Sequence, residues 1–122
     1  MEQDFKRDWG MEVTWASQDN HSGKILVFGN SGSQLPFHFH AETDKTWFVN
    51  SGKFMVRWID TKDGKVYQQE LIEGTTFYVE RLKPSSLIAI DANSTMLQTS
   101  NQDTVNDTFN IICLLNKKVP CH

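Results

Sequence analysis

Two histidines alternate with two phenylalanines in the segment Phe37-His38-Phe39-His40. In a β-strand, side chains two residues apart point to the same face of the sheet. Both imidazoles would therefore project to one face, and both phenyl rings to the other. Neutral imidazole is the commonest metal ligand in proteins, so the pair could begin a metal site. The alternative interpretation is a half-buried strand whose polar face carries two histidines.

The segments around this motif indicate β-structure along the whole chain. No stretch keeps the apolar period of an amphipathic helix, and short runs rich in β-branched and aromatic residues recur between turn signals. Asp63-Gly64 predicts a hairpin, because both residues tolerate the positive φ of a tight turn. We expect strands at Val13–Ala16, Lys24–Phe28, Gln34–His40, Thr46–Asn50, Lys53–Asp60, Lys65–Leu71, Thr75–Val79, Ser86–Ile90, Thr95–Thr99 and Phe109–Leu115. This spacing predicts an all-β sandwich or barrel.

Length and charge narrow the class of protein. With 122 residues the chain can bury a core without disulfides, and we expect residues 1–122 to form one domain. The net charge is −3 and no stripe of lysine or arginine occurs, which argues against nucleic acid as a partner. No apolar run approaches the ~18 residues of a membrane span. The polar N-terminus lacks the apolar segment of a signal peptide, which favours the cytoplasm.

Alternation along one run predicts the interior of the fold. Phe54, Val56 and Trp58 fall on one face of an expected strand, and all three are bulky and apolar. We therefore expect this face to pack in the core. Arg57 would then face a second sheet, a partner subunit or solvent.

Two stretches resemble the paired motifs of the cupin superfamily. His38-Phe39-His40, with Asp44 to Gly52, is similar to the first motif, in which two histidines, an acid and hydrophobic residues close on a glycine. Gly74–Val79, with Pro84-Ser85, is similar to the second motif, in which a glycine and a proline-rich turn lead to a histidine. The resemblance implies the cupin-type jelly-roll barrel, a double-stranded β-helix. Because one barrel hosts many chemistries, the motifs are specific for fold more than for function.

Further local matches point to a narrower group of cupins. Trp9–Glu12, Gly23–Leu26 and Ser100–Phe109 resemble small single-domain cupins related to the mannose-6-phosphate isomerase type. With these matches the resemblance extends from Trp9 to Ile112.

The resemblance also implies a metal site, from which this sequence departs. Such cupins hold a divalent metal with two histidines and an acid from the first motif and a histidine from the second. His38 and His40 match, whereas Lys45 stands at the acid position and Ser85 at the last histidine position. An ammonium group has no lone pair and repels a cation, and serine is a poor replacement for imidazole. The resemblance thus implies an incomplete site at His38 and His40, with at most a weakly bound zinc, manganese, iron or nickel ion.

Other side chains could complete such a site. Glu42, Asp44 and Gln98 offer oxygen atoms, and Gln98 falls on a strand where related cupins place an acid. Against this, Glu42 and Asp44 lie in an expected loop, where carboxylates are usually solvated. His21 lies in an expected turn, and we interpret it as a surface residue.

The first hypothesis for function is a ligand-binding cupin that needs no metal. A barrel mouth lined by cationic and neutral hydrogen-bond donors suits a sugar, a sugar phosphate or a small carboxylate. The residues that would line it are His38, His40, Lys45, Ser85 and Gln98. Trp47 could stack on a sugar face, although a place in the core is the ordinary expectation.

The alternative is an enzyme. In a sugar isomerase or epimerase, His38 or His40 could remove a proton next to a carbonyl group, and Lys45 or a divalent metal could stabilise the resulting oxyanion. A metal-dependent dioxygenase would need two histidines and a carboxylate, so Lys45 argues against that reaction. A structural role with an unused pocket is a further hypothesis.

Among partners, we expect a small molecule and a second copy of the chain. Trp9 and Trp15 are typical of a leading strand that covers a sheet edge or packs in a dimer interface. Small cupins commonly pair through sheet edges, so the resemblance implies a homodimer.

Overall fold

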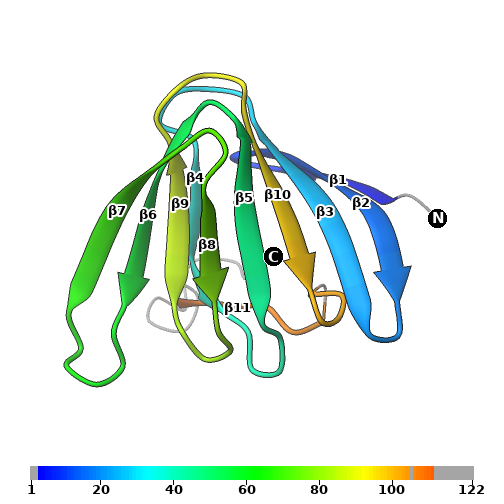
Figure 1. The fold of residues 1–122 in the computed structure, drawn as a ribbon, viewed down its shortest axis with the longest axis vertical. Helices are drawn as coiled ribbons and strands as arrows, with labels where there is room; N and C mark the ends of the chain where they lie inside the picture. Colours follow the sequence, from blue (N-terminus) through cyan, green and yellow to red (C-terminus); the bar gives the residue numbers. More distant parts are fainter. Residues whose placement is uncertain (1–2, 105, 112–122) are drawn as a thin grey trace.

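The computed structural model describes residues 3–104 and 106–111, which form a barrel of two antiparallel β-sheets (Figure 1). The strands are β1 (Gln3–Arg7), β2 (Gly10–Gln18), β3 (His21–Phe28), β4 (Gln34–Phe39), β5 (Lys45–Ser51), β6 (Lys53–Ile59), β7 (Val66–Ile72), β8 (Thr76–Val79), β9 (Ser85–Ala89), β10 (Ser94–Ser100) and β11 (Phe109–Asn110). A six-stranded sheet has the order β1-β2-β3-β10-β5-β8, and a five-stranded sheet the order β11-β4-β9-β6-β7. The all-β jelly-roll barrel predicted from the sequence is confirmed.

Each strand predicted between Val13 and Thr99 is observed, with ends that differ by at most three residues, and the larger differences lie at the two ends of the chain. The strand at Gln3–Arg7 is missing from the prediction because its residues are mostly polar; it is held by antiparallel pairing with β2. The strand expected at Phe109–Leu115 is observed as Phe109–Asn110, and its part from Ile112 onward lies outside the described residues. Among the described residues, no helix is long and apolar enough to cross a bilayer.

Two tight turns depend on glycine. The predicted Asp63-Gly64 hairpin joins β6 to β7, where Gly64 has a φ of 71° and donates its N–H to the carbonyl of Asp60 at 2.8 Å. Gly52 joins β5 to β6 with a φ of 82°, and a Cβ there would lie 2.0 Å from Oγ of Ser94. Both positions therefore favour glycine, because other residues adopt this left-handed conformation at a cost.

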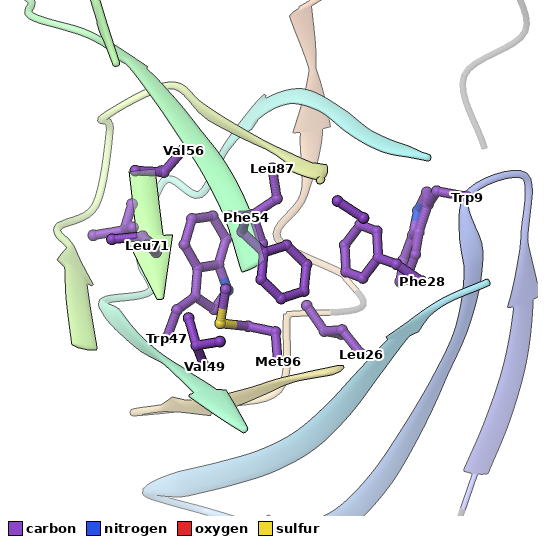
Figure 2. Packing of buried hydrophobic residues seen from close by; sticks show 12 residues of the cluster. Trp9, Leu26, Phe28, Trp47, Val49, Phe54, Val56, Leu71, Leu87 and Met96 are labelled. Atoms are coloured by element: carbon purple, nitrogen blue, oxygen red, sulfur yellow. The ribbon is translucent and has the colours of Figure 1, made fainter. Parts of the chain in front are cut away.

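The hydrophobic core fills the space between the two sheets. Phe54 and Val56 are fully buried, and Trp58 packs against the core at its edge, as the alternation predicts. The rings of Trp9, Phe28 and Phe54 form a row across the core (Figure 2), with successive centroids 4.6 Å and 5.0 Å apart. Trp9 is therefore a core residue.

The loops that follow β2, β4, β6, β8 and β10 meet at one end of the barrel, the lower end in Figure 1. Hydrogen bonds tie these loops together. Leu82 donates its N–H to the carbonyl of His40 at 2.7 Å. The Asp107 carboxylate accepts bonds from the backbone of residues 41–42 and the hydroxyl of Thr43 at 2.7 to 3.1 Å. Burial alone would raise the pKa of Asp107, but these hydrogen bonds outweigh it and hold the pKa below its usual value.

Candidate functional site

The two histidines of the opening motif lie at the loop end of the barrel and face its interior. The rings of His38 and His40 meet edge to face, with centroids 5.2 Å apart. Nδ1 of His38 lies 2.8 Å from the carbonyl of Pro36, and Nδ1 of His40 lies 2.9 Å from the carbonyl of Asp107. A carbonyl oxygen only accepts hydrogen bonds, so each Nδ1 carries the proton. Each Nε2 is then an unprotonated acceptor.

Lys45 reaches both acceptors from the opposite sheet. Its Nζ lies 2.6 Å from Nε2 of His38 and 2.8 Å from Nε2 of His40, so the amine donates to both rings. The same nitrogen lies 4.4 Å from the ring centroid of Trp47, within reach of a cation–π contact. Because β4 and β5 belong to different sheets, Lys45 links the two sheets across the barrel.

Burial shifts the proton equilibria of all three groups. Burial, followed by the neighbouring Lys45, lowers the pKa of His38 well below 6.5 and that of His40 to about 4. Burial also lowers the pKa of the Lys45 amine well below 10.5; the nearby Lys24 acts in the same direction, and Glu12 opposes it. Both imidazoles are therefore neutral at physiological pH, in agreement with their hydrogen bonds.

A second buried lysine lies deeper in the six-stranded sheet. Nζ of Lys24 lies 3.2 Å from a carboxylate oxygen of Glu12, 2.9 Å from the hydroxyl of Thr104 and 3.8 Å from the carboxylate of Asp103. Lys24 therefore has carboxylate partners, whereas the hydrogen-bond partners of Lys45 in the described part of the chain are the two imidazoles.

Gln98 supports the site from the neighbouring strand. It lies between Lys24 and Trp47 in the register of the six-stranded sheet. Its Oε1 accepts a hydrogen bond from the indole N–H of Trp47 at 2.9 Å. Trp47 is fully buried and part of the core, and its ring packs against the amine of Lys45.

Ser85 is the one predicted site residue with a hydroxyl group. It is the register partner of His38 on one side and of Trp58 on the other, which places its side chain on the inner face beside His38. The residue is fully buried, and its Oγ has no hydrogen-bond partner among the described residues. Buried polar atoms nearly always have a partner, so this oxygen calls for a ligand or water atom.

The five predicted residues His38, His40, Lys45, Ser85 and Gln98 thus share one end of the interior, and each is at most 5% exposed. The acidic residues considered as substitute ligands lie elsewhere. Asp44 is held on the surface by Arg81 at 2.8 Å, a hydrogen bond that lowers the pKa of the Asp44 carboxyl group. Glu42 is exposed, as is His21, which contacts Asn20.

A depression of about 210 Å³ opens at the rim of the barrel beside this interior group. It is lined by Trp58, Ile59, Asp60, Thr61, Lys62, Glu80, Arg81, Leu82 and Lys83. Nζ of Lys83 lies 5.2 Å from the ring centroids of both Trp58 and Phe77. The ring of Phe77 in turn stacks on Trp47, with centroids 6.4 Å apart. The rings of Trp58, Phe77 and Trp47 therefore form a continuous series from the rim depression to Lys45.

Sequence reasoning missed two parts of this arrangement. Asp107 fixes the tautomer of His40 through its carbonyl and the β4–β5 loop through its carboxylate. The sequence around Asp107 does not indicate this role, because its contacts with His40 and the β4–β5 loop join segments that are distant in sequence. The depression beside Lys83 was also missed, although the basic residue next to Pro84 in the second motif could have indicated it.

The residues present do not fit a divalent metal. The two Nε2 atoms converge, but Nζ of Lys45 lies within hydrogen-bond distance of both. A zinc–nitrogen bond is about 2.0–2.1 Å long, so an ion bound to both imidazoles would collide with the amine. Among the described residues, no group of three histidine, cysteine, aspartate or glutamate side chains could hold an ion.

Comparison with known proteins gives one family. A family model described as cupin matches residues 15–119. No curated protein matches the sequence.

Solved structures share the fold at low identity. Oxalate decarboxylase from Bacillus subtilis has a TM-score of 0.83 at 16% identity, covering 98% of this chain and 32% of its own. CapF, a capsular polysaccharide assembling protein from Staphylococcus aureus, has a TM-score of 0.78 at 14% identity, covering 90% of this chain and 34% of its own. KdgF from Halomonas sp. has a TM-score of 0.70 at 17% identity and covers 84% of this chain and 86% of its own. The chain thus spans about a third of the first two.

Proposed function

The chain belongs to the cupin family, and we propose that it binds a small polar or anionic ligand, of the sugar or sugar-phosphate type, at the loop end of its barrel. The observation that carries this proposal is the hydroxyl of Ser85, which is fully buried beside His38 and is one of five buried polar side-chain atoms without a partner among the described residues. An oxygen-rich ligand would supply that partner. We also propose, as the sequence resemblance implies, that the chain is related to small cupins of the mannose-6-phosphate isomerase type.

Charge and chemistry around Ser85 favour such a ligand. Lys45 is linked to His38, the register partner of Ser85, so an amine and a hydroxyl lie next to the same imidazole. Amines and hydroxyls suit phosphate, carboxylate and sugar oxygen atoms. The neutral imidazoles add no negative charge that would repel an anion.

The rim depression is the proposed access route. Trp58 lines it and is also the register partner of Ser85, so the depression ends one side chain away from the buried hydroxyl. Lys83 lies over the rings of Trp58 and Phe77. If the Lys83 side chain moves aside, a sugar ring can stack on these aromatic faces while its charged group meets the ammonium.

A ligand screen followed by calorimetry tests this function. We expect a sugar phosphate, nucleotide sugar or small carboxylate to raise the melting temperature of the wild type. For that compound, Lys45→Met and Ser85→Ala should each weaken binding by roughly tenfold or more, because one charge-assisted or buried hydrogen bond is worth on the order of 1.5–3 kcal/mol.

Lys53→Met is the matched control, because Lys53 is an exposed lysine on β6 at the opposite end of the barrel. Its affinity for the ligand should equal that of the wild type. Absence of a thermal shift with every compound class, or a ligand bound equally by wild type, Lys45→Met and Ser85→Ala, would contradict the proposal.

The geometry favours binding over a sugar isomerase or epimerase. A general base works best when its pKa lies near the operating pH. Burial and the neighbouring Lys45 lower the pKa of His40 to about 4, which makes it a weak base near neutrality. The Nε2 atoms of both histidines are also engaged by Lys45. A dioxygenase is less compatible still, because no carboxylate of the described residues contacts either Nε2.

A further inference from the structure

We propose that the side-chain nitrogen of Lys45 takes the place of a metal ion in this barrel, holding the two imidazoles together and keeping divalent cations out. The inference rests on the geometry of His38, His40 and Lys45, and it holds whatever the ligand is.

The position of Lys45 is that of a shared central atom. Both Nε2 lone pairs point to one nitrogen, at 2.6 Å and 2.8 Å. His38 lies on β4 of the five-stranded sheet, His40 directly follows that strand, and the lysine lies on β5 of the six-stranded sheet. The contact therefore joins the two sheets, as an ion bound by both would. Lys45 is almost fully buried, so the amine lies inside the barrel and not in solvent.

The surroundings of the two imidazoles still suit metal ligands. Metal-binding histidines almost always donate their other ring N–H to a carbonyl or carboxylate, which fixes tautomer and orientation. Here the carbonyls of Pro36 and Asp107 accept those bonds. The Nδ1 partners of both rings are therefore in place, and the amine of Lys45 occupies the point where a metal ion would meet both Nε2 atoms. Removing the amine and supplying a carboxylate at position 45 should restore a site of two histidines and one acid.

Calorimetric titration with Zn²⁺ of chelator-treated protein tests the proposal. We expect Lys45→Glu to bind one equivalent about 100-fold more tightly than the wild type, and to gain thermal stability from the ion. Lys45→Met removes the amine without supplying a ligand, so it should bind Zn²⁺ more weakly than Lys45→Glu. The double variant His38→Gln/Lys45→Glu should lose the gain. Any Zn²⁺ that binds to other residues binds to all variants alike, so this shared binding is subtracted from each titration.

Two results would overturn the proposal. The first is a folded Lys45→Glu protein that binds Zn²⁺ no more tightly than Lys45→Met. The second is a wild type that binds one equivalent tightly and loses it in His38→Gln. If Lys45→Glu does not fold, Zn²⁺ binding is compared between the wild type and His38→Gln. Equally weak Zn²⁺ binding by both proteins supports the proposal. Tight Zn²⁺ binding by the wild type that His38→Gln loses refutes it.

The outer face of the six-stranded sheet carries aromatic residues that are exposed to solvent. The strands β2, β3, β10, β5 and β8 lie side by side in Figure 1, and their outward positions carry no aspartate, glutamate, lysine or arginine, although 22% of the chain is charged. On the edge strand β1, the exposed Lys6 is the register partner of Met11 and borders this face. Leu97 lies between Ile25 and Phe48 in the register at the centre of this face. Trp15, Phe48 and Tyr78 are 52%, 38% and 58% exposed.

We infer that this outer face packs against the same face of a second copy of the chain. Antiparallel sheets with one face in water usually carry polar residues on that face, and exposed aromatic residues on an uncharged patch mark an interface. A charged partner surface would bury its charges here without counter-charges, at a high cost. The outer face of β2, β3, β10, β5 and β8 has no such charges, and two-fold symmetry would pair it with itself.

Light scattering coupled to size exclusion, at micromolar concentration, tests this interface. The wild type should be a dimer, and Phe48→Lys or Tyr78→Lys should shift it to a monomer. Val66→Lys is the control, because Val66 is 58% exposed but lies on β7 of the other sheet; this variant should remain a dimer. A monomeric wild type, or a Phe48→Lys or Tyr78→Lys protein that folds and stays dimeric, would refute the inference.

Discussion

The hydrogen bonds of His38 and His40 set the chemistry of the site at the level of single residues. Each ring donates from Nδ1 to a backbone carbonyl and accepts at Nε2 from Lys45. An imidazolium has a proton on both nitrogens and could not accept the lysine bond. Protonation of either ring therefore removes the acceptor on which the hydrogen bond from Lys45 depends.

This coupling predicts how stability depends on pH. In the unfolded chain the imidazole of His40 takes up a proton below its ordinary pKa of 6.5, whereas in the folded protein burial and Lys45 lower this pKa to about 4. The free energy of unfolding should therefore be highest above pH 6.5 and fall as the pH drops towards 4. A pKa difference of this size corresponds to a loss of roughly 3 kcal/mol.

Chemical denaturation between pH 4 and 7.5 measures this loss. His40→Gln should reduce the pH dependence over that window, because its amide does not titrate, while His38, whose pKa is also lowered by burial, retains its own contribution. His21→Gln, at an exposed residue, should keep the wild-type slope. A wild type whose unfolding free energy is constant over the window would contradict the proton equilibria described for the site.

The sequence identified the members of this group but not their contacts. The motif resemblance placed His38, His40, Lys45 and Ser85 at the ligand positions of the barrel, and the structure brings them to one end of the interior. That Lys45 bonds to both rings depends on how two sheets face each other, which local patterns do not specify. The long-range contact of Asp107 with His40 is unpredictable for the same reason.

At the level of strands and loops, local patterns were sufficient wherever turns and alternation were strong. The Asp63-Gly64 turn and the alternating run from Phe54 to Trp58 predicted β6, β7 and the hairpin between them. β1 was missed because edge pairing needs only the backbone and leaves little trace in the side chains. Strand ends also differed by a few residues, since pairing partners extend a strand beyond its apolar run.

The loops at the site end form a connected layer over the interior. Asp107 fixes the loop after β4, and Leu82 binds the carbonyl of His40 from the loop after β8. Leu82 has a φ of 66°, a conformation that costs energy for a residue other than glycine. The loop after β8 also lines the rim depression through Lys83. A single loop thus connects the rim of the barrel with the backbone next to the imidazoles.

At the level of the whole molecule, the two proposed surfaces are separate. The proposed ligand site lies at the loop end, whereas the proposed dimer interface is the outer face of the six-stranded sheet. Trp58 belongs to β6 of the five-stranded sheet and Lys83 to the loop between β8 and β9, so neither side chain lies on the outer face of β2, β3, β10, β5 and β8. Ligand binding and dimer formation should therefore be separable by mutation.

In our proposal, Lys45 holds two neutral imidazoles where a metal ion would otherwise bind. Long-range ¹H–¹⁵N spectra of the histidine side chains at pH 7 test it most directly. We predict that His38 and His40 both appear as neutral, Nδ1-protonated rings, that one equivalent of Zn²⁺ leaves their signals unchanged, and that Lys45→Met shifts both Nε2 resonances. Protonated Nε2 atoms, or signals of both rings that move together with one equivalent of Zn²⁺, would contradict the claim.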